Sequence, residues 1–141
     1  MFYGEYRYQL DNKNRLRVPA KLRGELGETF HLMKGSNGCL YVFDKSYMDS
    51  LTEKIKNVPI SDKQANLSLS LLFSATAEVE NDEQGRFLLP PNLKKYAQID
   101  KNVVIIGAGS RLEIWAEEVW DHITADNTFD SALEQLGKYG I

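Results

Sequence analysis

Two stretches of this sequence repeat one another, and this repeat limits the folds that the chain can adopt. The stretch 11–23 reads DNKNRLRVPAKLR, and the stretch 82–94 reads DEQGRFLLPPNLK, so that Asp, Arg, Pro and Leu coincide at the same spacing. After one inserted residue the likeness resumes, because LYVF at 40–43 corresponds to LEIW at 112–115. One such unit is too small to cover its own apolar face. We therefore expect the two units to share one core.

The sequence of each unit predicts the same order of short strands and helices. A strand leads into an Asp-x-x-x-Arg turn, and a second short strand ends at a proline. A short helix follows, with proline in the first turn, where its missing N–H costs nothing. Two further strands, rich in β-branched residues, then form a hairpin. We expect these helices at 19–26 and 90–97, the first hairpin at 29–34 with 39–43, and the second at 102–106 with 112–115, the hairpin turns lying at 35–38 and 107–110.

Four further helices are expected outside the units. Apolar residues at helical spacing predict one helix at 46–57, and the capping-box pattern SDKQ at 61–64 opens another that runs through Phe73. The segments 117–123 and 127–136 predict two terminal helices, the last with an apolar stripe of Phe129, Leu133 and Leu136 and a stop at Gly137. We expect these terminal helices to pack on the insert or on a neighbouring subunit.

The predicted fold class is α+β and mainly β. Two homologous units in one chain favour a pseudo-twofold β-barrel with flanking helices. We expect 1–141 to form a single domain, divided into a first unit at 1–47, a helical insert at 48–76, a second unit at 77–118 and C-terminal helices at 119–141.

Composition agrees with a folded protein in the cytoplasm. The chain has 43% hydrophobic and 11% aromatic residues, enough for a buried core. No apolar run reaches the roughly 18 residues of a membrane-spanning helix, and Met1–Leu10 lacks the apolar core of a signal peptide. Cys39 is the single cysteine, so that neither an internal disulfide nor a four-cysteine zinc site can form. We expect no metal and no cofactor.

Charge is unevenly distributed along the chain. The formal net charge is −3, which alone argues against nucleic acid. However, the stretch 1–23 contains six basic and two acidic residues, whereas 117–134 contains six acidic residues and no Lys or Arg. The sequence therefore predicts a basic head that suits a polyanion and an acidic end.

The Asp-x-x-x-Arg turns predict shaped loops that present arginine. Asp11 and Asp82 can accept hydrogen bonds from backbone N–H groups two and three residues on. Asn14 and Gly85 stand just before the arginines, where a positive φ is expected. Strand alternation places Leu16 and Val18 inside and the loop-flanking arginines outside, and in the second unit Phe87 inside. The expected DNA-contacting residues are Lys13, Asn14, Arg15, Arg17, Gln84 and Arg86, on loops shaped by Asp11, Asp82 and Gly85.

Two interpretations of one such turn compete. An outward arginine can hold a phosphate or read guanine O6 and N7 in a bidentate manner. Alternatively, the Asp and Arg form an ion pair that only staples the turn. Two copies at equivalent repeat positions, one inside the basic segment, favour the DNA interpretation.

At these residues the sequence resembles the MraZ family of bacterial transcriptional regulators, relatives of the AbrB and MazE DNA-binding proteins. The resemblance covers nearly the whole chain. It rests on FYGEY at 2–6, DNKNR at 11–15 with PAK at 19–21, GCL at 38–40, FSA at 73–75, DEQGR at 82–86 with PPNL at 90–93, and RLEIW at 111–115. Two positions depart from the family pattern: Asn14 stands where Gly is common, and Arg17 stands where the family is often apolar.

The resemblance implies a function and an assembly. It implies a pseudo-symmetric barrel of two AbrB-like repeats, a ring-like homo-oligomer, and binding to double-stranded DNA with short, G-rich direct repeats. Such repeats precede the cell-division and cell-wall gene cluster, which includes the regulator's own gene. It makes the two Asp-x-x-x-Arg loops the DNA-contacting motifs and implies a cytoplasmic, nucleoid-associated protein.

Two other classes of protein compete with a transcriptional regulator. An enzyme would need Cys39 and His31 as nucleophile and base, but no third orienting group stands out; His122 is expected on the surface. Glu78, Glu80 and Asp82 alternate along a strand and are expected to face solvent, and Gly107-Ala-Gly109 lacks the third glycine of a dinucleotide loop. The other rival is an antitoxin-like or other protein-binding module with the same barrel, whose acidic tail covers a basic partner.

Overall fold

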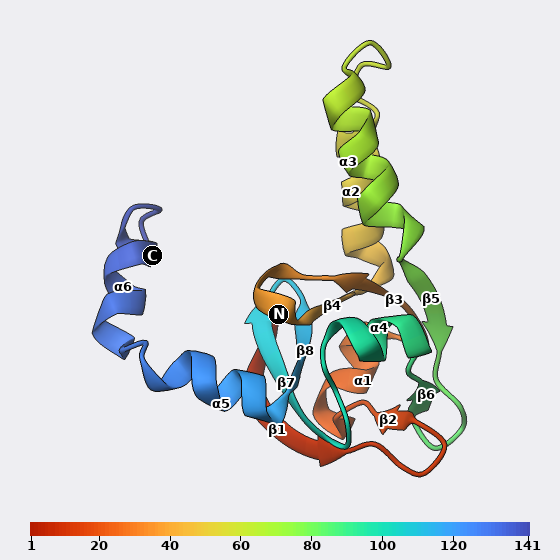
Figure 1. Cartoon of the computed structure of the whole chain (residues 1–141), viewed down its shortest axis with the longest axis vertical. Helices are drawn as coiled ribbons and strands as arrows, with labels where there is room; N and C mark the ends of the chain where they lie inside the picture. Colours follow the sequence, from red (N-terminus) through yellow and green to blue (C-terminus); the bar gives the residue numbers. More distant parts are fainter.

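A computed structural model describes all residues, 1–141, as a β-rich body from which two pairs of helices project (Figure 1). The first unit contains β1 (Phe2–Gln9), β2 (Arg15–Arg17), α1 (Ala20–Leu26), β3 (Thr29–Lys34), a 3-10 turn η1 (Ser36–Gly38) and β4 (Leu40–Phe43). The second contains β5 (Ala77–Glu80), β6 (Arg86–Leu88), α4 (Pro91–Tyr96), β7 (Asn102–Gly109) and β8 (Leu112–Ala116). The repeated sequence thus forms the same elements twice, in the predicted order.

The two units exchange strands within one sheet. Six strands form an antiparallel sheet in the order β1-β7-β8-β4-β3-β5. The first strand of each unit pairs with the third strand of the other unit, β1 with β7 and β5 with β3. The order is symmetric about the β4–β8 pair, where Tyr41 lies opposite its repeat counterpart Glu113. This arrangement is the pseudo-twofold symmetry that the repeat predicts.

The predicted closed barrel is not confirmed. The six-stranded sheet is open, with β1 and β5 as its edges, and β2 and β6 form a separate two-stranded sheet. After each Asp-x-x-x-Arg loop, the outgoing strand pairs with its counterpart in the other unit instead of continuing along a sheet edge. The edge strands β1 and β5 therefore end at these loops. Strands β2 and β6 leave the large sheet and pair with each other as a two-stranded ribbon. The mixed, mainly β class is observed.

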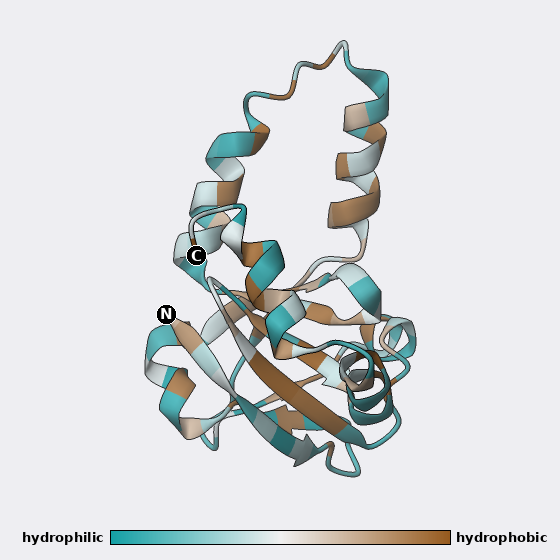
Figure 2. Ribbon diagram, turned by 90° about the vertical axis from the view of Figure 1, so that its left-hand side faces the viewer, coloured by the Kyte–Doolittle hydropathy of each residue, from teal (hydrophilic) through white to brown (hydrophobic).

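Both sheets bury one common core. Leu16 of β2 and Phe87 of β6 are buried and belong to the same cluster as Phe30 of β3. The rings of Phe30 and Phe87 meet edge to face, with their centroids 5.2 Å apart. Leu22 of α1 and Leu93 of α4, which coincide in the repeat, enter the same cluster. Hydrophobic residues concentrate in the strands of the body, as Figure 2 shows.

The boundary of one strand differs from the sequence prediction. The glycines of 107–110 predict a turn, but β7 continues through Gly109 because β1 pairs along its whole length. Gly107 permits this pairing, since a Cβ there would lie 2.3 Å from the backbone nitrogen of Tyr3. The hairpin turn therefore falls at Ser110 and Arg111.

The remaining helices form two projections. The hairpin α2 (Lys45–Ile55) and α3 (Lys63–Ser74) rises from the body between β4 and β5, and α3 is capped by Asp62 rather than by Ser61. The arm α5 (Glu117–Ala125) and α6 (Phe129–Gly137) follows β8. Arg7 anchors α5 through Glu117 at 3.0 Å and Asp121 at 2.9 Å. In contrast, α6 has no buried residue, so that its expected packing on the insert is not present within a single chain. None of the six α-helices has the length and apolar character that crossing a membrane requires.

Candidate nucleic-acid interface

The carboxylate of Asp11 shapes the first loop. Its Oδ1 accepts hydrogen bonds from the backbone N–H groups of Lys13 at 2.9 Å and Arg15 at 2.8 Å. Its Oδ2 accepts a third bond, from Nε of Arg15 at 2.7 Å. The backbone partners of the carboxylate lie two and four residues on, rather than two and three as expected, because the N–H of Asn14 donates to the backbone carbonyl oxygen of Asp11 instead.

Asp82 shapes the second loop with the same contacts. Its carboxylate accepts from the N–H groups of Gln84 at 2.8 Å and Arg86 at 3.0 Å, and from Nε of Arg86 at 3.0 Å. These donors stabilise the ionised form of both aspartates. The backbone N–H of Arg15 is the main cause that lowers the pKa of Asp11 from 3.8 to about 2. The corresponding N–H of Arg86 lowers the pKa of Asp82 in the same way.

The residues before the two arginines have left-handed backbone conformations, as predicted. The φ angle of Asn14 is 58°, and that of Gly85 is 74°. Glycine and asparagine are the residue types that adopt this region at low cost. Asn14 therefore fits the position that glycine occupies in the second loop.

The arginines line the outer face of a two-stranded ribbon. In the antiparallel pair of β2 and β6, Arg15 lies opposite Leu88, Leu16 opposite Phe87, and Arg17 opposite Arg86. Leu16 and Phe87 face the core, while the other four face outward. The side chains of Arg15 and Arg86 are 28% and 25% exposed. The predicted alternation is confirmed.

Both sequence interpretations of the turn describe part of this geometry. Each arginine forms the ion pair with its aspartate, as the staple interpretation requires. The pair uses Nε, so that Nη1 and Nη2 remain at the outer end of each guanidinium. A guanidinium fixed through Nε and free at its Nη atoms has the fork that binds phosphate or the guanine edge.

The two loops also contact each other. The N–H of Val18 donates to the carbonyl oxygen of Gly85, and the N–H of Leu89 donates to that of Asn14, both at 3.0 Å. Arg17 adds a bond from its Nη1 to the carbonyl oxygen of Gln84 at 2.9 Å. The structure thus brings the predicted site residues of both units to one end of the body, with Lys13 and Gln84 exposed near the loop tips.

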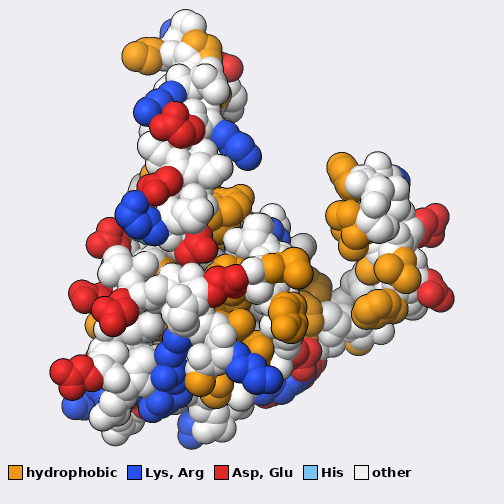
Figure 3. Space-filling model, turned by 180° about the vertical axis from the view of Figure 1, so that it is seen from behind, with side chains coloured by type: hydrophobic (Ala, Val, Ile, Leu, Met, Phe, Trp, Pro, Cys, Tyr) orange, Lys and Arg blue, Asp and Glu red, His pale blue; other side chains and the backbone are white.

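Two cations outside the predicted set of site residues also contact the loops. Arg23 and Lys94 coincide in the repeat, and they lie at the end of α1 and in α4. Lys94 Nζ donates to Asn14 Oδ1 at 3.1 Å, across the boundary between the units. Their equivalent positions in the repeat were the available signal. Lys and Arg side chains gather at this end of the body in Figure 3.

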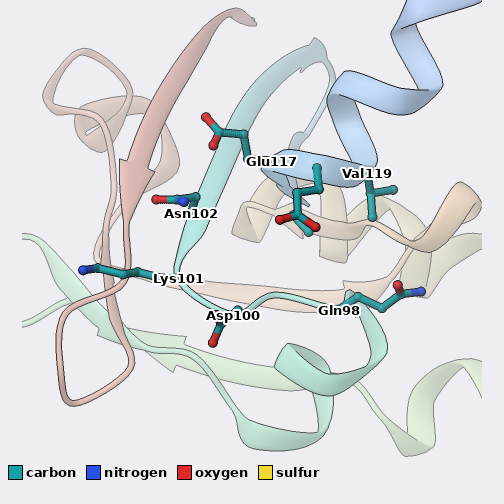
Figure 4. A pocket seen from close by; sticks show the side chains of 8 residues that line it. Gln98, Asp100, Lys101, Asn102, Glu117 and Val119 are labelled. Carbon is teal, nitrogen blue, oxygen red and sulfur yellow. The ribbon is translucent and has the colours of Figure 1, made fainter.

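A polar pocket outside the ribbon is acidic rather than basic. A pocket of about 110 Å³ lies between the α4–β7 connection and α5 (Figure 4), and its carboxylates Asp100, Glu117 and Glu118 outnumber the single amine of Lys101. Its negative balance opposes binding of a polyanion. No three His, Cys, Asp or Glu side chains gather in a way that could hold a metal ion.

The candidate enzyme residues lie in ordinary structural surroundings. Cys39 is buried, and this burial raises the pKa of its thiol to about 12 and keeps it protonated at neutral pH. His31 lies in β3 beside Glu78, with 3.4 Å between its Nε2 and the carboxylate. Glu78 and Glu80 form the exposed face of β5, as predicted, but Asp82 does not continue that strand: β5 ends at Glu80, and Asp82 lies in the following loop, where it accepts hydrogen bonds from Gln84 and Arg86.

Fold and surface together define a tandem-repeat β protein whose two arginine loops meet on one ribbon. A family model with the description "MraZ protein, putative antitoxin-like" matches the chain twice, over residues 1–71 and 72–135. The chain belongs to the MraZ family.

Curated relatives resemble the chain over their full lengths. A protein of Clostridium beijerinckii is 46% identical over 100% of both chains, and one of Clostridium tetani is 42% identical over the same share. A third, from Carboxydothermus hydrogenoformans, is 43% identical over 98% of this chain and 95% of its own. All three are named transcriptional regulator MraZ. These names support a role in transcription regulation.

Proposed function

We propose that this chain is a sequence-specific DNA-binding regulator that uses the β2–β6 ribbon and its two Asp-x-x-x-Arg loops as the contact surface. Its proposed target is the set of short direct repeats ahead of the cell-division and cell-wall gene cluster, which includes its own gene. The proposed contacts are Lys13, Asn14, Arg15, Arg17, Gln84 and Arg86. Such a regulator would reside on the nucleoid.

The observation that carries the proposal is the fixed orientation of the two arginine side chains. Each loop arginine is held at Nε by an aspartate, which itself accepts two backbone N–H groups. Orientation is therefore set before a ligand arrives, and the side-chain entropy lost on binding is small. A bidentate arginine contact to guanine discriminates against a wrong base by about 1–3 kcal/mol.

The symmetry of the ribbon suits duplex DNA. Leu16 and Phe87 pair at the centre of the ribbon, and the loops extend to either side as pseudo-twofold mates. Two related loops on one face match the repeating backbone of a duplex. The overall charge of −3 restricts this attraction to the basic end of the body.

Self-association is the second part of the proposal. Helix α6 exposes Phe129, Leu133 and Leu136, and α3 exposes Leu67 and Leu71. Isolated helices of this length are marginal in water, and apolar stripes of this kind are normally covered. We propose that another copy of this chain covers them in a ring-like homo-oligomer, so that several weak sites act together on repeated DNA.

Footprinting on the DNA upstream of its own gene tests the proposal, with anisotropy titrations at several salt concentrations to count phosphate contacts. We expect protection of short direct repeats and a binding constant that falls steeply with salt. Lys54→Ala serves as the control, because it removes a basic residue from α2, which projects from the body at the opposite end from the ribbon (Figure 1). A flat salt dependence, or equal affinity for unrelated duplexes, would contradict sequence-specific binding.

A protein-binding module is the second candidate. The acidic side chains of the α5–α6 arm and the antitoxin-like description of the matching family favour it. Under this function the purified chain would bind no duplex DNA even at low salt, whereas an acidic arm would still bind a basic protein.

A further inference from the structure

The short helices α1 and α4 each send a cation to the loop of the opposite unit. Arg23 extends from the last turn of α1, and its Nε donates to the carbonyl oxygen of Val18 at 2.9 Å. Val18 is in turn bonded through its N–H to Gly85. Lys94 of α4 reaches Asn14 directly. Equivalent residues of the repeat thus reach the loop of the opposite unit by different contacts, Lys94 through a hydrogen bond and Arg23 by packing against Gly85.

Arg23 occupies the space that a side chain at position 85 would need. A Cβ built on Gly85 would lie 2.5 Å from Cζ and Nε of Arg23, which is closer than van der Waals contact allows. Gly85 is itself buried although it belongs to an exposed loop. The guanidinium of Arg23 therefore lies against the bare backbone of the second loop.

In the first loop, the residue before the arginine has a side chain, and the cation that contacts it is a lysine instead of an arginine. Asn14 has the same left-handed backbone as Gly85, and its Oδ1 accepts the hydrogen bond from Lys94. A lysine presents a single ammonium to one acceptor, whereas a guanidinium is wide and flat. The two loops therefore combine their residues differently, glycine with arginine in one and asparagine with lysine in the other.

We propose that Arg23 and Lys94 are positioning residues that hold the DNA-binding loop of the opposite unit, and that each cation determines which residue its loop carries before the arginine. The inference rests on the proposed function for its effect on DNA. Each loop is shaped by contacts from the other unit: the Val18–Gly85 and Leu89–Asn14 backbone bonds, the bond from Lys94 to Asn14, and the packing of Arg23 against Gly85. The two loops consequently act as a coupled pair.

Converting the second loop to the pattern of the first tests this proposal. The single variant Gly85→Asn places a side chain against Arg23, and the double variant Gly85→Asn with Arg23→Lys recreates the asparagine–lysine pair. Gly38→Asn is the control for an asparagine at positive φ, since its backbone φ is 81° and nothing lies within 4 Å of its Cβ position. Hydrogen exchange of the Gln84 and Arg86 amides measures loop order, and anisotropy measures affinity for the duplex upstream of the chain's own gene.

We expect Gly85→Asn to speed exchange at both amides and to weaken DNA binding about tenfold, a factor that corresponds to about 1.4 kcal/mol. The double variant should recover most of both losses, and Gly38→Asn should show neither. A double variant no better than Gly85→Asn, or a silent Gly85→Asn, would overturn the role of Arg23. If exchange follows the expected pattern but the wild-type chain binds no DNA, the loop pairing stands and the proposed function fails.

Discussion

Arg15 lies directly opposite Leu88 in the ribbon of β2 and β6, although the repeat aligns Arg15 with Arg86. An antiparallel pair centred on Leu16 and Phe87 sets the first residue of one strand against the last residue of the other. The outer face of the ribbon therefore carries three arginines and one leucine, which is 60% exposed. Its charge is weakest at the corner that Leu88 occupies.

Replacing Leu88 by arginine should strengthen DNA binding. The substitution gives the second unit the residue that Arg17 supplies in the first, on the same outer face. One additional phosphate contact should steepen the slope of log binding constant against log salt by about 0.9. Anisotropy titrations at several salt concentrations measure this slope. Leu88→Gln controls for removal of the exposed leucine, and an arginine variant with the wild-type slope would show that this corner lies outside the interface.

A negative charge in the apolar stripe of α6 should reduce self-association. Leu133 is 53% exposed between Phe129 and Leu136, one helical turn from each. We expect Leu133→Glu to shift the mass measured by light scattering toward the 16.1 kDa of a single chain. Gln135→Glu adds the same charge on the opposite side of the helix and should leave the mass unchanged. Equal masses for both variants would show that another surface joins the subunits.

The local structure could be predicted from the sequence because it depends on neighbouring residues. Turn chemistry predicted the positive φ of Asn14 and Gly85, and alternation predicted which residues of β2 and β6 face the core. These preferences are set within a few residues of the chain.

The pairing of distant segments could not be predicted in the same way. Strand β1 would satisfy its hydrophobic pattern against either hairpin, and only the packed core selects β7 as its partner. For the same reason the glycines at 107 and 109 indicate a turn when the sequence is considered alone, although Gly107 lies inside a strand where Tyr3 approaches closely. Lys94 and Asn14 belong to different units and meet only because the units exchange strands. The alignment of Lys94 with Arg23 in the repeat therefore identifies no hydrogen-bond partner for either cation.

The common core predicts a sharp difference between neighbouring residues of β6. Phe87 is 3% exposed and packs on Phe30, whereas Leu88 is exposed. We expect Phe87→Ala to lower the free energy of unfolding by about 3–5 kcal/mol, the usual cost of deleting a buried aromatic ring. Leu88→Ala should change it little. Urea denaturation measures both, and similar values for the two variants would contradict the burial of β6 against the large sheet.

The loops should keep their shape in moderately acidic solution. The pKa of Asp11 is about 2, below its ordinary 3.8, chiefly because the N–H of Arg15 donates to the carboxylate. A depressed folded-state pKa contributes stability that is present above pH 3.8 and is lost as the pH falls toward 2. We expect the amide resonances of Lys13 and Arg15 to shift together in this window. A midpoint near 3.8 would show that the loop does not hold Asp11 in its ionised form.

Arg15→Ala separates a role in DNA binding from a role in stapling the turn. The substitution removes the Nε bond to Asp11 but leaves the backbone N–H groups of Lys13 and Arg15 bonded to the same carboxylate. The loop should therefore persist, and the melting temperature should change little. DNA affinity should fall by more than about tenfold, since a lost contact costs about 1–3 kcal/mol and recurs in every subunit of an oligomer.

Arg15→Lys distinguishes a phosphate contact from recognition of a guanine base. A lysine can hold a phosphate but lacks the bidentate geometry of guanine recognition, so that loss of sequence preference with retained salt dependence indicates base reading. If Arg15→Ala melts early but binds DNA normally per folded molecule, the arginine only staples the turn and the ribbon is not the DNA-binding surface.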